Sequence, residues 1–70
     1  MFGKVLKAAR KKAGMTQEKL AFAADLDRTY ISRLENGRMS PTLDTLLRIG
    51  DALGVPGSTL VARVERARKR

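Results

Sequence analysis

Between Asp27 and Arg38 the sequence reads DRTYISRLENGR, a segment rich in side chains that donate hydrogen bonds. Only Ile31 and Leu34 within it are aliphatic. These two residues are three positions apart, so a helix places them on one narrow side and leaves the rest of its surface free. Arginine guanidinium groups bind planar acceptors through paired donors. The segment therefore predicts a helix that is anchored along one side and presents polar groups to a ligand.

The overall charge favours a polyanionic ligand. The 70 residues carry 15 Lys and Arg against 7 Asp and Glu, for a formal charge of +8. Six cations fall between Lys4 and Lys19, and five fall between Arg63 and Arg70. Nucleic acid is the first expectation for this distribution, and an anionic membrane surface is the second. The membrane is the weaker alternative because the apolar side of the basic N-terminal segment lacks Trp and is needed for a core.

The residue types that catalysis and metal binding require are scarce. The chain has no His and no Cys, which excludes disulfides and argues against a zinc site. We find no Gly-rich phosphate loop and no carboxylate pair with a supporting base. We therefore expect a protein that is not an enzyme and uses no metal or cofactor. No apolar run approaches the roughly 20 residues of a membrane span, so a cytoplasmic protein is expected.

The spacing of apolar residues predicts an all-α chain of five helices. They are expected over about 2–13, 17–24, 28–35, 43–53 and 57–66. Thr16, Asp27 and Thr42 are suited to cap helix N-termini, and Gly14 and Gly54 are suited to end helices. The chain then forms one domain over residues 1–66, followed by a basic and flexible tail over residues 67–70.

The second and third helices are separated by a turn of about three residues, which forces them to cross steeply, as in a helix-turn-helix. A steep crossing brings the two backbones close together, and Ala21 is the small residue that permits it. Ile31 and Leu34 are then expected to pack inward from the third helix.

The segments TQEKLA, YISRLENG and PTLDTLLRIGDALGV follow one another between Thr16 and Val55. In this order they resemble the phage repressor and Cro-like helix-turn-helix family, often called the XRE family. The resemblance implies a compact five-helix bundle like that of lambda repressor, with the third helix in the DNA major groove. Two positions depart from the family pattern. Asp25 stands where the family often has Gly, and Gly50 stands where a helix-forming residue is expected.

The resemblance and the docking geometry of such domains together assign candidate DNA contacts. The residues expected to contact bases are Arg28, Thr29, Ser32 and Arg33. The residues expected to contact phosphates are Gln17, Lys19, Tyr30, Asn36, Arg38 and Arg10. The resemblance also implies that Arg10 pairs with Glu35, an acid otherwise unexpected beside a polyanion. For Tyr30, packing against the loop between the third and fourth helices is an equal alternative.

The expected function is that of a regulator of repressor or controller type that binds double-stranded DNA. It is expected to act as a homodimer on a palindromic or pseudopalindromic operator. Leu60, Val61 and Val64 are predicted to lie at or beside the dimer interface, with closure of the monomer core as their alternative. Three further hypotheses remain: an antitoxin that also binds a toxin partner, a protein-interaction module with an incidental basic surface, and the DNA-binding part of a longer chain.

Overall fold

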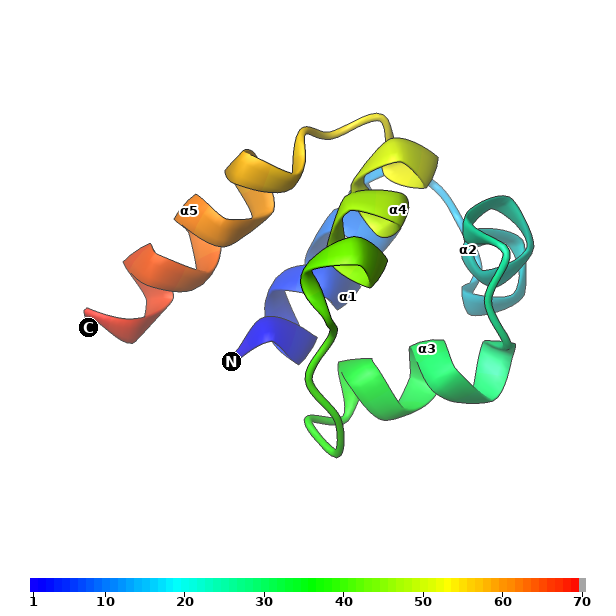
Figure 1. Cartoon of the computed structure of the whole chain (residues 1–70), viewed down its shortest axis with the longest axis horizontal. Helices are drawn as coiled ribbons and strands as arrows, with labels where there is room; N and C mark the ends of the chain where they lie inside the picture. Colours follow the sequence, from blue (N-terminus) through cyan, green and yellow to red (C-terminus); the bar gives the residue numbers. More distant parts are fainter. Residues whose placement is uncertain (70) are drawn as a thin grey trace.

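The computed structural model describes residues 1–69 and contains five α-helices, with no strand among those residues. Figure 1 shows their arrangement, with α1 lying between α5 on one side and the α2–α3 pair on the other. The bounds are α1 Phe2–Lys12, α2 Gln17–Ala24, α3 Arg28–Glu35, α4 Leu43–Leu53 and α5 Gly57–Arg68. The predicted all-α, five-helix fold is confirmed.

The ends of two helices differ from the prediction. Helix α1 ends at Lys12, one residue early, and Gly14 adopts a left-handed conformation just beyond it. Helix α5 continues to Arg68, so Ala67 and Arg68 belong to the helix and not to the tail. Arg70, the last residue of the predicted tail, lies outside the described residues.

Each helix contributes one or two large, fully buried aliphatic side chains to the core. The fully buried large side chains are Leu6, Leu20, Ile31, Leu34, Ile49 and Leu60. Leu60, which is predicted at or beside the dimer interface with closure of the monomer core as the alternative, lies in the core. The exposed fraction of Leu60 is 0%, because its side chain points into the monomer core.

Two of the three predicted N-caps are formed as expected. The Thr16 Oγ1 accepts a hydrogen bond from the Lys19 N–H at 3.0 Å, and the Thr42 Oγ1 accepts one from the Thr45 N–H at 3.1 Å. Asp27 occupies the N-cap position of α3, but its side chain makes no capping bond to any described residue. The Asp27 carbonyl instead accepts from the Tyr30 and Ile31 N–H groups, so the backbone alone begins this helix.

Gly50 is explained by close packing. A Cβ at this position would lie 2.6 Å from the Val55 carbonyl oxygen, in the segment that turns back to start α5. Gly3 is similar, because a Cβ there would collide with the carbonyl oxygens of Glu35 and Leu34. The absence of a side chain at Gly3 lets α1 lie directly against the C-terminal end of α3.

Candidate nucleic-acid interface

The turn between α2 and α3 consists of Asp25, Leu26 and Asp27. Asp25 has φ 58° and ψ 48°, the left-handed conformation that glycine usually takes at the end of a helix. The Leu26 N–H donates to the Ala21 carbonyl at 2.8 Å, which closes the end of α2. Asp adopts this conformation more readily than most residues with a side chain, so Asp25 can take the place where the family often has Gly.

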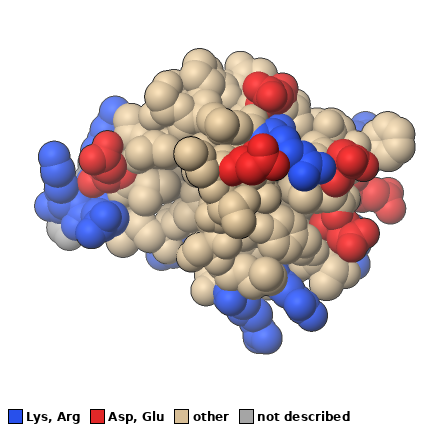
Figure 2. Space-filling view, in the orientation of Figure 1, with Lys and Arg blue, Asp and Glu red and all other residues tan. Residues whose placement is uncertain are grey.

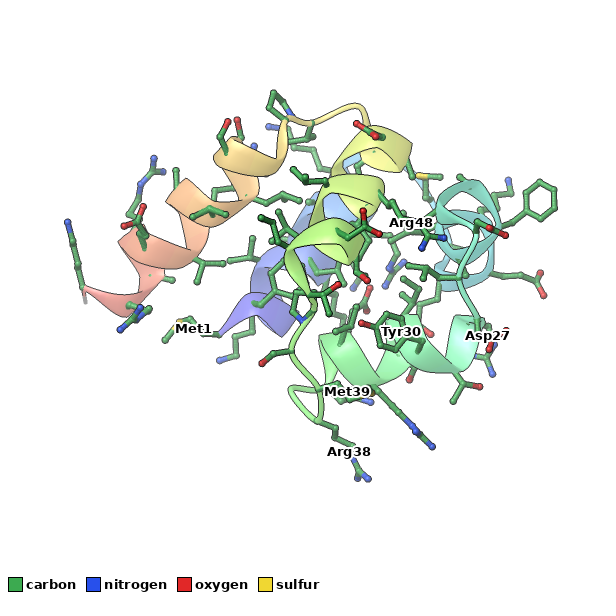
Figure 3. All side chains as sticks on the ribbon, viewed as in Figure 1. Met1, Asp27, Tyr30, Arg38, Met39 and Arg48 are labelled. Carbon is green, nitrogen blue, oxygen red and sulfur yellow. The ribbon has the colours of Figure 1, made fainter. Side chains whose placement is uncertain are left out.

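Arg48 of α4 holds this turn from outside, a role that the sequence did not reveal. One guanidinium nitrogen, NH2, donates to the Ala24 carbonyl at 2.9 Å and to the Asp25 carbonyl at 2.7 Å. The same atom lies 3.6 Å from the Asp25 carboxylate, which is fully exposed, so the carbonyl bonds are the firmer contacts. Figure 3 shows Arg48 at the α2 end of the turn. A positive charge at the C-terminus of a helix is also favoured by the helix dipole.

Helix α3 buries only its inner side and leaves its outer side exposed. Ile31 and Leu34 have exposed fractions of 0%. The side chains of Arg28, Thr29 and Arg33 are exposed, and Ser32 is half-buried at the flank. All four predicted base-contacting residues therefore lie on one helix, on the sides that the core leaves open. Figure 2 shows basic side chains gathered at the lower edge of the molecule, below α3.

Arg10, Glu35 and Gln17 form a hydrogen-bonded network that joins α1, α3 and α2. The Arg10 Nε donates to Glu35 Oε2 at 2.6 Å, and its NH2 donates to Glu35 Oε1 at 3.1 Å. The Gln17 Nε2 donates to the same Glu35 Oε1 at 3.1 Å. The expected pairing of Arg10 with Glu35 is present.

This network does not fit the predicted phosphate contact of Arg10. The third guanidinium nitrogen of Arg10, NH1, donates to the Met15 carbonyl at 2.8 Å, and the residue as a whole is only 8% exposed. Arg10 is turned inward, where it orients Glu35 and, through Glu35, the side chain of Gln17. Gln17 itself is half-buried at the first turn of α2, with its amide oxygen uncommitted among the described residues.

The environment of Glu35 favours its charged form. Burial raises the pKa of the Glu35 carboxyl, but hydrogen bonds from Arg10 and Gln17, together with the charges of Arg10 and Lys7, outweigh that effect. The net pKa lies below its usual value. The carboxylate is therefore neutralised internally, which explains how an acid is accommodated next to the exposed face of α3.

The other predicted phosphate-contacting residues surround α3. Lys19, Asn36 and Arg38 are exposed, and Figure 3 shows Arg38 projecting away from the body of the protein. The Arg38 N–H donates to the Arg33 carbonyl at 2.9 Å, and Gly37 has φ 74°, so the chain turns sharply after the helix. The ring of Tyr30 is half-buried against the core, and it lines a hollow together with Thr45 at the start of α4.

Exposed large apolar side chains occur on α4 and α5, in addition to Met1, Phe22 and Met39. Leu43 is 72% exposed, Leu47 47% and Val61 40%, whereas Val64 is half-buried. A Cβ at Gly57 would lie 2.6 Å from Leu47 Cδ2, so the first turn of α5 rests on Leu47. We call Leu43, Leu47 and Val61 the α4–α5 apolar face. Its signal in the sequence is an apolar stripe on the fourth helix that is wider than a core requires.

Among residues 1–69 no cluster of three or more metal-ligating side chains occurs. In the same residues no helix has the length and apolar character needed to cross a membrane.

Comparisons with known proteins place this geometry among helix-turn-helix proteins. A helix-turn-helix family model matches residues 6–60. The control protein C.BamHI of Bacillus amyloliquefaciens is 45% identical over 62 residues, covering 87% of this chain and 76% of that protein. The control protein C.MunI of Mycoplasma is 42% identical over 66 residues, covering 93% and 89%.

The solved structures that resemble this chain include controller proteins as well. The restriction–modification controller protein C.AhdI of Aeromonas hydrophila superimposes with a TM-score of 0.82 at 36% identity, covering 84% of this chain and 89% of that one. The controller protein C.Esp1396I superimposes with a TM-score of 0.87 at 33% identity, covering 99% and 91%. The chain belongs to the phage repressor-like, XRE-type helix-turn-helix family of DNA-binding transcription regulators.

Proposed function

We propose that this chain is a controller-type transcription regulator that reads a double-stranded operator through α3 and works as a homodimer. The observation that carries the proposal is the contrast between the two sides of α3. Ile31 and Leu34 are fully buried, while Arg28, Thr29 and Arg33 are exposed along the open side. A helix held in this way presents a fixed pattern of donors to base edges, which specific readout requires.

The basic loop after α3 and the first turn of α2 supply the backbone contacts in this proposal. Arg38 and Asn36 lie at one end of α3, and Gln17 and Lys19 lie at the start of α2. Contacts on both sides of a recognition helix fix its register on the duplex without reading sequence. Gln17 is well suited to this role because Glu35 fixes one of its amide donors and leaves the rest of the group free.

The α4–α5 apolar face supports the proposed homodimer. Leu43 is 72% exposed and Leu47 47%, which is a large apolar exposure for so small a protein. A second copy that covers this face by a two-fold axis would place two recognition helices side by side. One turn of DNA sets their separation at about 34–36 Å, and the operator is then palindromic or nearly so.

The experiment that tests the proposed function is the selection of bound sites from random duplex DNA, using the full chain in moderate salt. The expected result is one enriched sequence with two inverted half-sites about 10 base pairs apart, centre to centre. Binding without any enriched sequence would contradict specific readout by α3. A single enriched half-site would contradict the proposed dimer but not the specific readout by α3.

A further inference from the structure

A groove runs between α1 and α5, apart from the face that the proposed function uses. Its larger part is an open hollow of about 550 Å³ lined by Met1, Lys4, Arg63, Arg66 and Ala67. A second hollow of about 250 Å³ is lined by Ala9, Lys12, Ala13, Leu53, Val55 and Arg63. Arg63 lines both hollows, so the two are adjacent along the seam between the helices. Figure 3 shows Met1 at the start of α1, facing the last turns of α5.

The groove is positively charged along its length. Lys4 and Lys12 lie on its α1 side, and Arg63 and Arg66 lie on its α5 side. None of the described lining residues is acidic, and none of these four cations forms an ion pair within residues 1–69. Like charges that converge without internal partners repel one another, and a bound anion relieves that repulsion.

The groove and the recognition helix lie on different sides of α1. Helix α1 meets α3 through Gly3 and Arg10, whereas Met1, Lys4 and Lys12 line the groove. The α4–α5 apolar face is separate as well. Gly57, one turn before Val61 on α5, lies against Leu47, whereas Arg63 and Arg66 line the groove with α1. A second copy on the apolar face therefore leaves the groove open.

The shape and lining of the groove favour an extended phosphate chain over a small anion. The hollows are shallow and follow one another, and no aromatic side chain lines them on which a base could stack. Charged side chains along a groove track a sugar–phosphate backbone without reading its sequence.

We propose that the α1–α5 groove binds the backbone of a second DNA segment, distinct from the one that contacts α3. The proposal rests on the chain being a DNA-binding protein, but not on which sequence α3 reads. One molecule then holds two stretches of DNA, the first by sequence and the second by charge.

The experiment compares two double variants with equal charge. Lys12→Gln with Arg66→Gln removes one cation of the groove from each helix. The control, Lys11→Gln with Arg68→Gln, removes neighbouring exposed cations that do not line the groove. Each protein is saturated with unlabelled operator from the selection above. A labelled duplex of unrelated sequence is then added, and its anisotropy is followed over a series of salt concentrations.

The wild type and the control pair are expected to bind the second duplex with similar salt dependence. The groove pair should bind it more weakly, with a log–log salt slope reduced by about 1.8, or about 0.9 for each phosphate that is no longer neutralised. Equal weakening in both pairs, or no second duplex bound by the wild type, would overturn the proposal. A selective decrease in the operator affinity of the groove pair would also overturn it, because the groove would then hold the flank of the same duplex.

Failure of the proposed function is a separate result. If the selection yields no operator, the labelled duplex is titrated against each protein alone. A second duplex bound by the wild type and the control pair but not by the groove pair would still support the groove, and equal numbers of duplexes bound by all three proteins would overturn it.

Discussion

Glu35 shows how a single residue adjusts the site that surrounds it. Its carboxylate accepts two bonds from Arg10 and one from Gln17, and these residues belong to three different helices. A buried ion pair of this kind does not by itself guarantee stability, because both charges lose their hydration. Its clearest consequence here is geometric, since it fixes the start of α2 against the end of α3.

The pKa of Glu35 leads to a prediction about acid. A carboxyl with a lowered pKa in the folded protein stabilises the fold above its unfolded pKa, and that contribution is lost as the pH falls through the folded pKa. We expect the free energy of unfolding to decrease once the pH is lower than about 4.5, which is the ordinary pKa of a glutamate carboxyl. Glu35→Gln should lower stability at pH 7 by about 1–3 kcal/mol, because Arg10 loses its counter-charge.

Thermal or urea unfolding from pH 7 to pH 3 measures this effect. The Glu35→Gln protein should lose less stability over that range than the wild type. Glu18→Gln, in an exposed acid of α2, serves as the control and should behave as the wild type does. Parallel curves for Glu35→Gln and the wild type would show that Glu35 is not the group responsible.

Arg33 and Gln17 should have different effects on DNA binding. Arg33 lies on the open side of α3, so Arg33→Ala is expected to cost about 1–3 kcal/mol on the operator and much less on unrelated DNA. Gln17→Ala should weaken both by similar factors, because backbone contacts carry no sequence information. The measurement is the ratio of operator to unrelated affinity at one salt concentration. An unchanged ratio in Arg33→Ala would make this arginine a phosphate contact.

Among the helices, the helix-turn-helix pair depends on α4. The turn carries a non-glycine residue in the left-handed region at Asp25, and the carbonyls of Ala24 and Asp25 point out from the end of α2. Arg48 satisfies both carbonyls from the neighbouring helix. The angle between α2 and α3 is therefore supported from outside the pair, in addition to the contacts between Ala21, Ile31 and Leu34 in the core.

Arg48→Met tests this support, because methionine retains much of the apolar stem and removes the donors. We expect operator affinity to fall by about tenfold, which corresponds to about 1.4 kcal/mol for the two hydrogen bonds removed. The amide protons of the turn should also exchange faster. Arg68→Met is the control, since Arg68 is exposed on α5 and makes no side-chain hydrogen bond within residues 1–69. Equal decreases in the operator affinity of the two variants would show that the loss of one positive charge, and not the loss of the hydrogen bonds to the turn, causes the effect.

At the scale of the whole molecule, charged side chains are unevenly distributed over the face that Figure 2 shows. Acidic side chains gather over α4 and the α2–α3 turn, with basic atoms among them, and basic side chains lie below α3 and, beside acidic atoms, at the end of α5. A 70-residue chain buries only a small core, so the proposed association would add to its stability. The α4–α5 apolar face is the surface that we propose for that association.

Leu43→Ser with Val61→Ser is expected to shift the chain toward the monomer and to weaken operator binding by more than about tenfold. The reason is that one domain then contacts one half-site without its partner. Sedimentation velocity over a range of concentrations measures the first effect, and a gel shift measures the second. Phe22→Ser, in the 88% exposed aromatic residue of α2, is the control and should remain as dimeric as the wild type. A double variant that sediments as the wild type would place the interface elsewhere.

The local structure of this protein is predictable from its sequence. Helix periodicity, the threonine caps and the glycine stops act within a few residues, so α3 and α4 begin and end at the predicted positions. The fold class and the position of the helix-turn-helix follow from the same signals. The pairing of Arg10 with Glu35 is also predicted from the sequence, through the resemblance to a known family.

What each side chain faces depends instead on how the helices pack. The sequence predicts a phosphate contact for Arg10 and a dimer interface for Leu60, yet both are buried by helices distant in the chain. Arg48 has no special signal in the sequence, because its acceptors lie 23 and 24 residues away. The seam that makes Lys4 and Lys12 neighbours of Arg63 likewise exists only once α5 returns to α1. Periodicity specifies which side of a helix is apolar, but the packing of the other helices determines which polar side chains become internal and which remain free to bind.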